Sequence, residues 1–510
     1  MPQNFLDCAR EQVFLMPPSL REWLPEDHLA WFVIETVAGM DLRAFYGAYR
    51  ADGHGRAAYD PSVMVSVLAY AYATGVFSSR GIERHCRQDV AYRVITANRV
   101  PDHATVARFV RRHQEALGDL FTVVLELCGK AGLVEAGIVA VDGTKLRGNA
   151  SREQSVDYGQ IAGEIIAGAI VIDEAEDQEH GEARGDELPP ELSTEEGRRA
   201  WLARELAARR AAAGQPEPEQ QQPEEGDEFD AERIVARVQG RQGWLREANR
   251  QLDQQRWLES RRVSRSREQR LWEAGRRLEE DLAAEVRGNS AYEAYRAQGR
   301  MKDGRRFGAP PKPYQPPATP TGTVNLSDPD THLMQGHKAF VQGYNAQTVV
   351  TENQIVLAAE ISTEPGDFSN LRPMITATQR ELERASIAHT PQIALADTGY
   401  WNEQHMDDVA AQGITVLIPP DSGKRQGERP GWTGGRYTWM RRVLATDLGD
   451  KFYRKRRQTI EPVFGHTKHN RKFTQLHRRG RAAARTEWQL LMMTHNLTKL
   501  YNHQIATAAP

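Results

Sequence analysis

One acidic side chain, Glu461, lies in an otherwise basic stretch of the chain. Four consecutive basic residues, at positions 454–457, come shortly before it, and Lys468 follows it. Between residues 451 and 485 the sequence has twelve Lys or Arg and one acid. A carboxylate surrounded by basic residues suits a site that grips a phosphate backbone and places a metal-binding oxygen beside it.

Two further acids, Asp142 and Asp397, follow short apolar runs that read as buried strands. The runs are GIVAV at 137–141 and PQIALA at 391–396. The carboxyl ends of parallel strands meet at one edge of a sheet, so the two acids lie together if their strands are neighbours. The local alternative for Asp142 is a simple Asp-Gly turn.

Together, these three carboxylates would make a set of hard oxygen ligands without a Cys or His partner. Such a set predicts Mg²⁺, for which Mn²⁺ can substitute. Two ions held this way can activate a water or a 3′-hydroxyl and stabilise the leaving oxygen at a phosphodiester. The predicted ligands are Asp142, Asp397 and Glu461.

The elements that must position these acids alternate between strands and helices. The predicted order is strand, two paired strands, helix, strand, helix, strand and finally a helix-rich C-terminus that carries Glu461. This order predicts an α/β fold with a mixed sheet. The ranges are 137–146, 338–350, 354–361, 370–385, 391–397, 402–411 and 414–418, with a loop-rich stretch at 419–450.

Residues 1–132 are predicted to form an all-helical N-terminal domain. Asp60-Pro61, Ser78 and Asp102 are start signals for three short helices. Short helices joined by tight connections, with arginines on the last one, are typical of a helix-turn-helix DNA reader. The alternative is a general helical or dimerisation domain. The arginines that would contact DNA are Arg108, Arg111 and Arg112.

Residues 151–320 differ in composition and are interpreted as a charged helical insertion. Residues 179–230 are acidic and contain the run QPEPEQQQPEE, so we expect them to be flexible. Residues 231–301 have leucines at seven-residue steps, which predicts a helical hairpin or short coiled coil. A Pro-rich linker follows at 308–320. The catalytic core would then comprise residues 133–150 and 321–505.

The overall composition excludes several classes of protein. The 510 residues have a formal net charge of −3, but residues 171–230 alone have nineteen acids and six Arg. Such asymmetry indicates a nucleic-acid face in the basic part of the chain. No signal peptide or run of about 18 apolar residues is found, so we expect a cytoplasmic protein that does not bind membranes. The three Cys are far apart and indicate neither a zinc site nor disulfides.

Several motifs in combination resemble the DDE transposases of bacterial insertion sequences. The similarity is to the IS4-like superfamily and most of all to its IS1182 group, and it covers most of the chain outside the insertion. It implies an RNase H-like core in which Asp142, Asp397 and Glu461 bind the metal. The matching segments are 141–145 (VDGTK), 343–347 (GYNAQ), 396–400 (ADTGY), 460–465 (IEPVFG), 477–480 (HRRG), 487–488 (EW), 495–497 (HNL), 78–83 (SSRGIE) and 101–105 (PDHAT).

The related IS4 pattern is Tyr, two residues, Arg, three residues, Glu, six residues, Lys. Glu461, Lys468 and Arg457 fit its spacing, whereas Arg454 stands where the pattern has Tyr. Pairing Tyr453 with Arg456 instead fits the spacing from Tyr to Arg but not the spacing from Arg to Glu. Arg457 and Lys468 share a face with Glu461 only if the helix is unbroken, and Pro462 disfavours helical geometry at Glu461.

The function predicted from these observations is a transposase that cuts DNA at the ends of an insertion sequence and joins them to target DNA. Its partners would be double-stranded DNA, namely terminal inverted repeats and target, and a second copy of the chain in a synaptic complex at the nucleoid. Two alternatives remain: a non-catalytic DNA-binding regulator on an inactive core, and a nuclease of the same fold that cuts without joining. Predicted DNA contacts are Arg456, Arg457, Lys468, Arg478 and Arg479, together with Arg108, Arg111 and Arg112.

Overall fold

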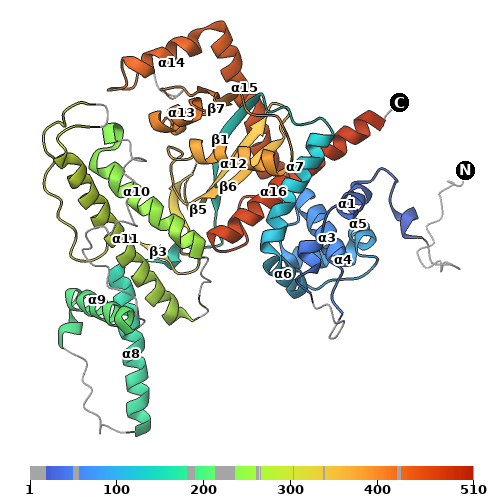
Figure 1. Ribbon diagram of the computed structural model, residues 1–510. Helices are drawn as coiled ribbons and strands as arrows, with labels where there is room; N and C mark the ends of the chain where they lie inside the picture. The colour runs from blue at the N-terminus through green and yellow to red at the C-terminus, as the bar shows by residue number, and fades with distance from the viewer. Residues whose placement is uncertain are drawn as a thin grey trace, which may run out of the picture.

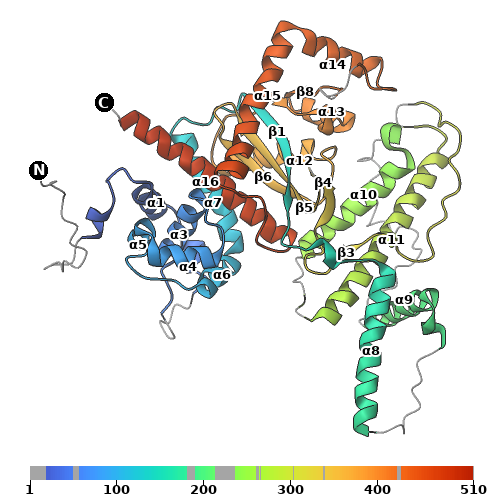
Figure 2. The ribbon, with the colours of Figure 1, turned by 180° about the vertical axis from the view of Figure 1, so that it is seen from behind.

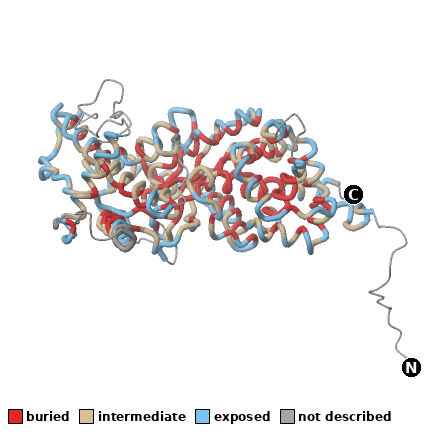
Figure 3. The backbone as a smooth tube through the Cα atoms, turned by 90° about the horizontal axis from the view of Figure 1, so that it is seen from below, coloured by how far each residue is buried: buried red, intermediate tan, exposed pale blue. Residues whose placement is uncertain are grey.

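The computed structural model of this chain places a mixed sheet between two groups of helices (Figures 1 and 2). The N-terminal helices lie on one side of the sheet and the inserted helices on the other. Figure 3 shows that buried residues run through the middle of the elongated molecule. The structure describes residues 19–49, 57–180, 190–212, 236–259, 264, 266–301, 304–336, 339–421 and 427–508.

The sheet has six strands, and its central strand is β1 (Ile138–Arg147). On one side β1 pairs antiparallel with β5 (Phe340–Thr351), whose other edge is shared by β4 (His332–Gln335) and β6 (Val356–Ser362). On the other side β1 pairs parallel with β7 (Ile393–Leu395), which pairs parallel with β8 (Thr415–Leu417). This order confirms the predicted α/β class with an RNase H-like mixed sheet.

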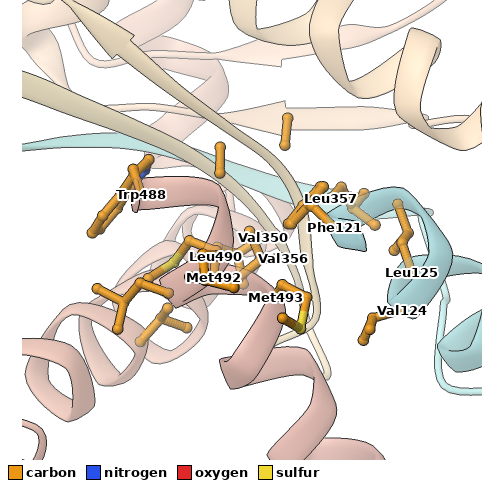
Figure 4. Packing of buried hydrophobic residues seen from close by; sticks show 14 of the residues in the cluster. Phe121, Val124, Leu125, Val350, Val356, Leu357, Trp488, Leu490, Met492 and Met493 are labelled. Carbon is orange, nitrogen blue, oxygen red and sulfur yellow. The ribbon is translucent and has the colours of Figure 1, made fainter. Parts of the chain in front are cut away.

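Helix α16 (Arg481–Ala508) forms the main apolar contact beneath the sheet (Figure 4). Trp488 and Met492 on this helix are fully buried, as are Val350 and Val356 on the strands above. Phe121, from helix α7 (Gln114–Lys130), packs into the same core. Burial of each side chain of this size stabilises the fold by about 1.5–3 kcal/mol. Because α16 packs against both the sheet and α7, it holds the sheet and the N-terminal helices together.

The N-terminal region is helical, as predicted, and its caps follow from the sequence. Asp60 accepts a hydrogen bond from the Ser62 N–H at 2.8 Å, and Asp102 accepts one from the Thr105 N–H at 2.6 Å. Each satisfies an otherwise unpaired donor of the first turn. The helices are α1 (Leu29–Ala38), α2 (Arg43–Tyr46), α3 (Pro61–Ala73), α4 (Ser79–Gln88), α5 (Val90–Ile95), α6 (His103–Arg112) and α7 (Gln114–Lys130).

The inserted helices leave and rejoin the core through a two-stranded neck, β2 (Ser155–Val156) and β3 (Val324–Asn325). Between these strands are α8 (Tyr158–His180), α9 (Glu195–Ala212), α10 (Ala236–Glu259) and α11 (Arg267–Ala297). The last two form a hairpin in which Trp244 packs against Tyr292 and Tyr295. Leu271 and Leu278 on α11 face α8 and α9 instead of α10.

Two segments expected to lack regular structure are helical. Residues 195–212 form α9, because Leu202 and Leu206 lie one turn apart and pack on Ile161 of α8. Within the supposed loop at 419–450, α14 (Gly435–Ala445) forms around the buried Met440. In α9 the many charged residues, and in α14 the Gly and Arg residues, made the short apolar stripe hard to recognise in the sequence. The low-complexity run at 215–225 lies outside the described residues.

The remaining core helices are α12 (Leu371–Arg384), α13 (Glu403–Ala410) and α15 (Asp447–Gly465), which is followed by a π-helical turn (His466–Asn470). Among the described helices, none has both the length and the apolar character needed to cross a bilayer.

Candidate active site

Asp142 and Asp397 occupy equivalent positions beyond the last paired residues of two parallel strands. The ladder between β1 and β7 ends with the pair Ala140 and Leu395. Each acid stands two residues after its member of that pair. Strand β1 continues past Asp142 to Arg147, where it pairs with β5 and no longer with β7. The two carboxylates therefore project at the same edge of the sheet, where β7 has ended.

Arg456 of α15 joins these two carboxylates. Its Nη2 atom lies 2.7 Å from Asp142 Oδ2 and 3.8 Å from Asp397 Oδ2. The Arg456 side chain is only 11% exposed, so the interaction is poorly screened by solvent. One guanidinium group thus offsets part of the repulsion between two neighbouring acids.

Burial is the main electrostatic influence on the acid pair. It raises the pKa of Asp142 to about 7, with a further increase from the charge of Asp397, while Arg456 opposes both. Burial also raises the pKa of Asp397. Two carboxyl groups with raised pKa values at one place are typical of sites that bind a cation or exchange protons.

A third acid, Asp367, lies beside this pair and was not identified from the sequence. Its Oδ1 atom accepts hydrogen bonds from Asn345 Nδ2 at 2.7 Å and Gln347 Nε2 at 2.8 Å, and forms an ion pair with Lys145 Nζ at 3.3 Å. Its charge contributes to the raised pKa of both Asp142 and Asp397. Asp367 is in the loop after β6, where no local pattern marks it.

Glu461 stands apart from the two aspartates. Its side chain is 60% exposed on α15, and the nearest ion-pair partner is Arg457 Nε at 4.0 Å. Within the described part of the chain, no three His, Cys, Asp or Glu side chains converge as a metal-binding group. The structure therefore brings together two of the three predicted ligands, with Glu461 five residues along the helix from Arg456.

Helix α15 runs through Pro462 instead of beginning or ending there. A proline has no N–H to donate to the carbonyl four residues earlier. That carbonyl, of Gln458, accepts a hydrogen bond from Gln354 Nε2 at 3.3 Å instead. The π-helical turn that follows brings Lys468 back to β1, where Lys468 Nζ donates to Thr144 Oγ1 and lies 3.5 Å from the Lys145 carbonyl.

The alternative pairing of Tyr453 with Arg456 describes the buried face of α15 better than the pairing through Arg457. Arg457 is 77% exposed, whereas Arg456 contacts both aspartates. Burial raises the pKa of Tyr453, and the charges of Arg456 and Asp397 also act on its hydroxyl group. The spacing in sequence could not decide this, because it does not reveal which side of the helix meets the sheet.

The other predicted DNA contacts are distant from the acid pair in sequence and lie on different elements. Arg108, Arg111 and Arg112 are exposed on α6 and at its end. Arg478 and Arg479 precede α16. Arg478 Nη2 donates to Gln114 Oε1 at 2.5 Å, and Arg479 Nε donates to the Asn149 carbonyl at 3.0 Å.

The chemistry of the acid pair fits a divalent cation. Asp142 and Asp397 supply oxygen ligands only, and they already gather around the cationic group of Arg456. Carboxylate oxygens are the donors that Mg²⁺ and Mn²⁺ prefer. A metal ion would compete with Arg456 for these oxygens.

The sequence matches two families that are both described as transposase domains. Residues 18–112 match Transposase domain (DUF772), and residues 313–497 match Transposase DDE domain. Asp397 and Glu461 fall within the second match, whereas Asp142 lies between the two. No match was found among curated proteins or among solved structures.

Proposed function

We propose that this chain, which belongs to the DDE transposases, cuts DNA at the ends of an insertion sequence and transfers these ends to target DNA. It combines the two transposase domains in a pairing that fits the IS1182 group. The observation that supports this most directly is the pair of carboxylates, Asp142 and Asp397, brought together in register at the edge of the sheet, where the Asp142 side chain is 16% exposed and that of Asp397 is 43% exposed. The basic residues around them would hold the phosphates of the substrate.

DDE transposase domains generally use a divalent metal, and the proposed cofactor is a pair of Mg²⁺ ions, with Mn²⁺ as a substitute. Asp142 and Asp397 would hold them, and Glu461 would complete the site after moving toward the pair. When bound, such ions supply Lewis-acid activation of the attacking water or 3′-hydroxyl and offset charge on the phosphate.

The residues of the chain itself prepare the site for this chemistry. Arg456 keeps the aspartates partly neutralised before substrate arrives, and its guanidinium group would turn to a phosphate oxygen once the carboxylates are engaged. Asp367 holds Asn345 and Gln347 against β1, so the strand that carries Asp142 is fixed in place. Lys468, held on Thr144, would be a second phosphate contact.

Double-stranded DNA, both inverted-repeat ends and target, is the proposed partner, with synapsis in a homodimer at the nucleoid of the cytoplasm. Two ends must be cut and joined together, which favours two active sites in one complex.

The test is cleavage and joining with DNA that carries the gene's own flanks and a circular target, in Mg²⁺. Loss of one ligand removes several kcal/mol of transition-state stabilisation, which is at least about a hundredfold in rate. Asp142→Asn, Asp397→Asn and Glu461→Gln should each lose cutting and joining to that extent, while Glu383→Gln on the surface of α12 should not. Wild-type rates in the three variants would refute the assignment, and cutting without joining would identify a nuclease.

A further inference from the structure

A cleft of about 1980 Å³ opens between the N-terminal domain and the insertion, at a place separate from the acid pair. One wall is formed by α6 and the start of α7, and the opposite wall by the beginning of α11. The floor is the segment 477–483 that leads into α16. In Figures 1 and 2 these helices come from the two groups on either side of the sheet.

The lining of this cleft is strongly basic. It includes four acids, of which Asp119 pairs with Arg384 at 2.5 Å and Asp330 pairs with Arg277 at 2.7 Å. Against them stand ten arginines: Arg108, Arg111, Arg112, Arg256, Arg270, Arg276, Arg277, Arg478, Arg479 and Arg481. Arg256, Arg276 and Arg277 are themselves paired with acids. The surplus of positive charge therefore comes from the other seven arginines, although the chain as a whole has a net charge of −3.

Several of these arginines make no ion pair with any acid that the structure describes. Arg108 and Arg111 are exposed on α6, and Arg112 lies over the Tyr49 ring at 4.4 Å. On the opposite wall, Arg270 Nε is buried and has no hydrogen-bond partner among the described residues, and the same holds for Arg478 Nη1 on the floor. Donors left unpaired in a basic cleft favour an anion with several acceptor oxygens.

The acid site and the cleft are connected through β1. The carbonyl of Arg147, at the end of this strand, accepts a hydrogen bond from the Leu476 N–H at 2.8 Å, and His477 begins the cleft floor. The five residue steps from Asp142 to Arg147 span about 17 Å at about 3.3 Å per step. That is the rise of roughly five base pairs at about 3.4 Å each.

We propose that this cleft holds duplex DNA by its phosphates, with α11 of the insertion closing against α6 as a clamp. Arginines on both walls and on the floor suit a polyanion with many phosphates better than a small anion. The inference rests on the proposed function for the identity of the duplex, and it assigns a role to the insertion.

The experiment measures affinity for a duplex of arbitrary sequence, about 40 base pairs long, in EDTA so that no cleavage takes place. Arg270→Ala should weaken binding about fivefold or more at moderate salt and reduce the slope of log K against log salt by about 0.9 for each phosphate that the variant no longer neutralises. The matched control is Arg287→Ala, an exposed arginine on the same helix outside the cleft. For α6, Arg108→Ala with Arg111→Ala should weaken binding, and Arg99→Ala should not.

If Arg270→Ala and Arg287→Ala bind duplex DNA with equal affinity, α11 does not contact the DNA and the proposed clamp is wrong. Arg270→Lys keeps the positive charge and should retain most of the affinity for duplex DNA. This variant distinguishes the loss of a charge from a loss of folding, and circular dichroism checks that each variant is folded. Tighter binding of polyglutamate than of duplex would show that the cleft takes an acidic polypeptide, and would also overturn the proposal. Asp142→Asn should bind normally and fail to cleave. If it cleaves, the proposed function fails while the binding result for the cleft still stands.

Discussion

Arg456 is the residue that most affects the charge of the acid pair, because its Nη2 atom lies within ion-pair distance of both carboxylates. Removing this group removes the internal competitor for a metal ion. We expect Arg456→Gln to bind Mn²⁺ more tightly, on the order of tenfold, and to cleave DNA more slowly. Electron paramagnetic resonance of free Mn²⁺ measures the affinity.

The control for this variant is Arg454→Gln, whose side chain is 76% exposed on the same helix and pairs with Asp450. It should leave Mn²⁺ affinity unchanged. If Arg456→Gln also leaves it unchanged, the ions do not bind at Asp142 and Asp397.

Gly143 follows Asp142 at a position with no room for a side chain. A Cβ atom there would lie 2.7 Å from Asp367 Oδ1 and 2.8 Å from Asn345 Oδ1. Gly143→Ala should therefore displace the polar groups that fix β1 and lower the free energy of unfolding by about 1–3 kcal/mol. Urea denaturation measures this. Gly137→Ala, where nothing lies within 4 Å of the added Cβ, is the control and should change stability little.

The sequence predicts which aspartates meet, but not the residues that surround them. Asp142 and Asp397 each follow an apolar run, and parallel pairing then places them at one edge. Asp367 could not be found this way, since it reaches the site only because β5 pairs with β1 and presents Asn345 and Gln347 to it. The position of Glu461 also depends on how α15 packs, which spacing alone does not determine.

At the level of elements, α16 determines the conformation of the segment that precedes it. Glu487 is buried on this helix and accepts hydrogen bonds from the backbone N–H groups of His477 at 2.9 Å and Arg478 at 3.1 Å. Glu487→Ala leaves both donors unpaired, so we expect a loss of about 3 kcal/mol in unfolding free energy. Since the cleft floor loses its support, affinity for duplex DNA should fall as well.

Thermal or urea unfolding measures the first effect, and Gln504→Ala near the exposed end of the same helix is the control. Glu487→Gln, which retains one acceptor oxygen, should be intermediate. A loss no greater than that of Gln504→Ala would mean that the segment is held by other contacts.

Short elements were the hardest to predict. Three-residue strands such as β7 and β8 were found because their apolar runs are unbroken. In α14, by contrast, charged and polar residues and Gly interrupt the apolar ones, and the structure shows that the buried Met440 packs on the core together with the partly buried Tyr437 and Val443. Pro462 gave a misleading stop signal, because the carbonyl it leaves unpaired obtains a partner, Gln354, from a distant part of the chain.

At the level of the whole molecule, Asp328 joins the end of the insertion to the core. It accepts hydrogen bonds from the Tyr344 hydroxyl at 2.8 Å and from the Gly480 N–H at 3.1 Å. Burial raises its pKa to about 6, with a contribution from Asp330. The ordinary value in an unfolded chain is about 3.9, so the native state binds the proton more tightly than the unfolded state.

Stability should therefore fall as the pH rises from about 4 to about 6, by about 2 kcal/mol from this group. Asp328→Asn cannot titrate and should reduce that dependence. Urea midpoints of the two proteins across this range give the comparison. Parallel pH profiles would show that Asp328 does not titrate in this window.

Strands β2 and β3 bring the two ends of the insertion together, so we expect that the insertion can be removed without breaking the main sheet. Its two ends are adjacent, with Ser155 opposite Asn325 and Val156 opposite Val324. A gene could gain or lose everything between them in one event without altering the register of the main sheet. A chain in which a two-residue Asn-Gly turn replaces residues 157–323 should still fold, as circular dichroism would show, and should bind duplex DNA weakly. If it fails to fold, the core and its insertion have evolved as one inseparable unit.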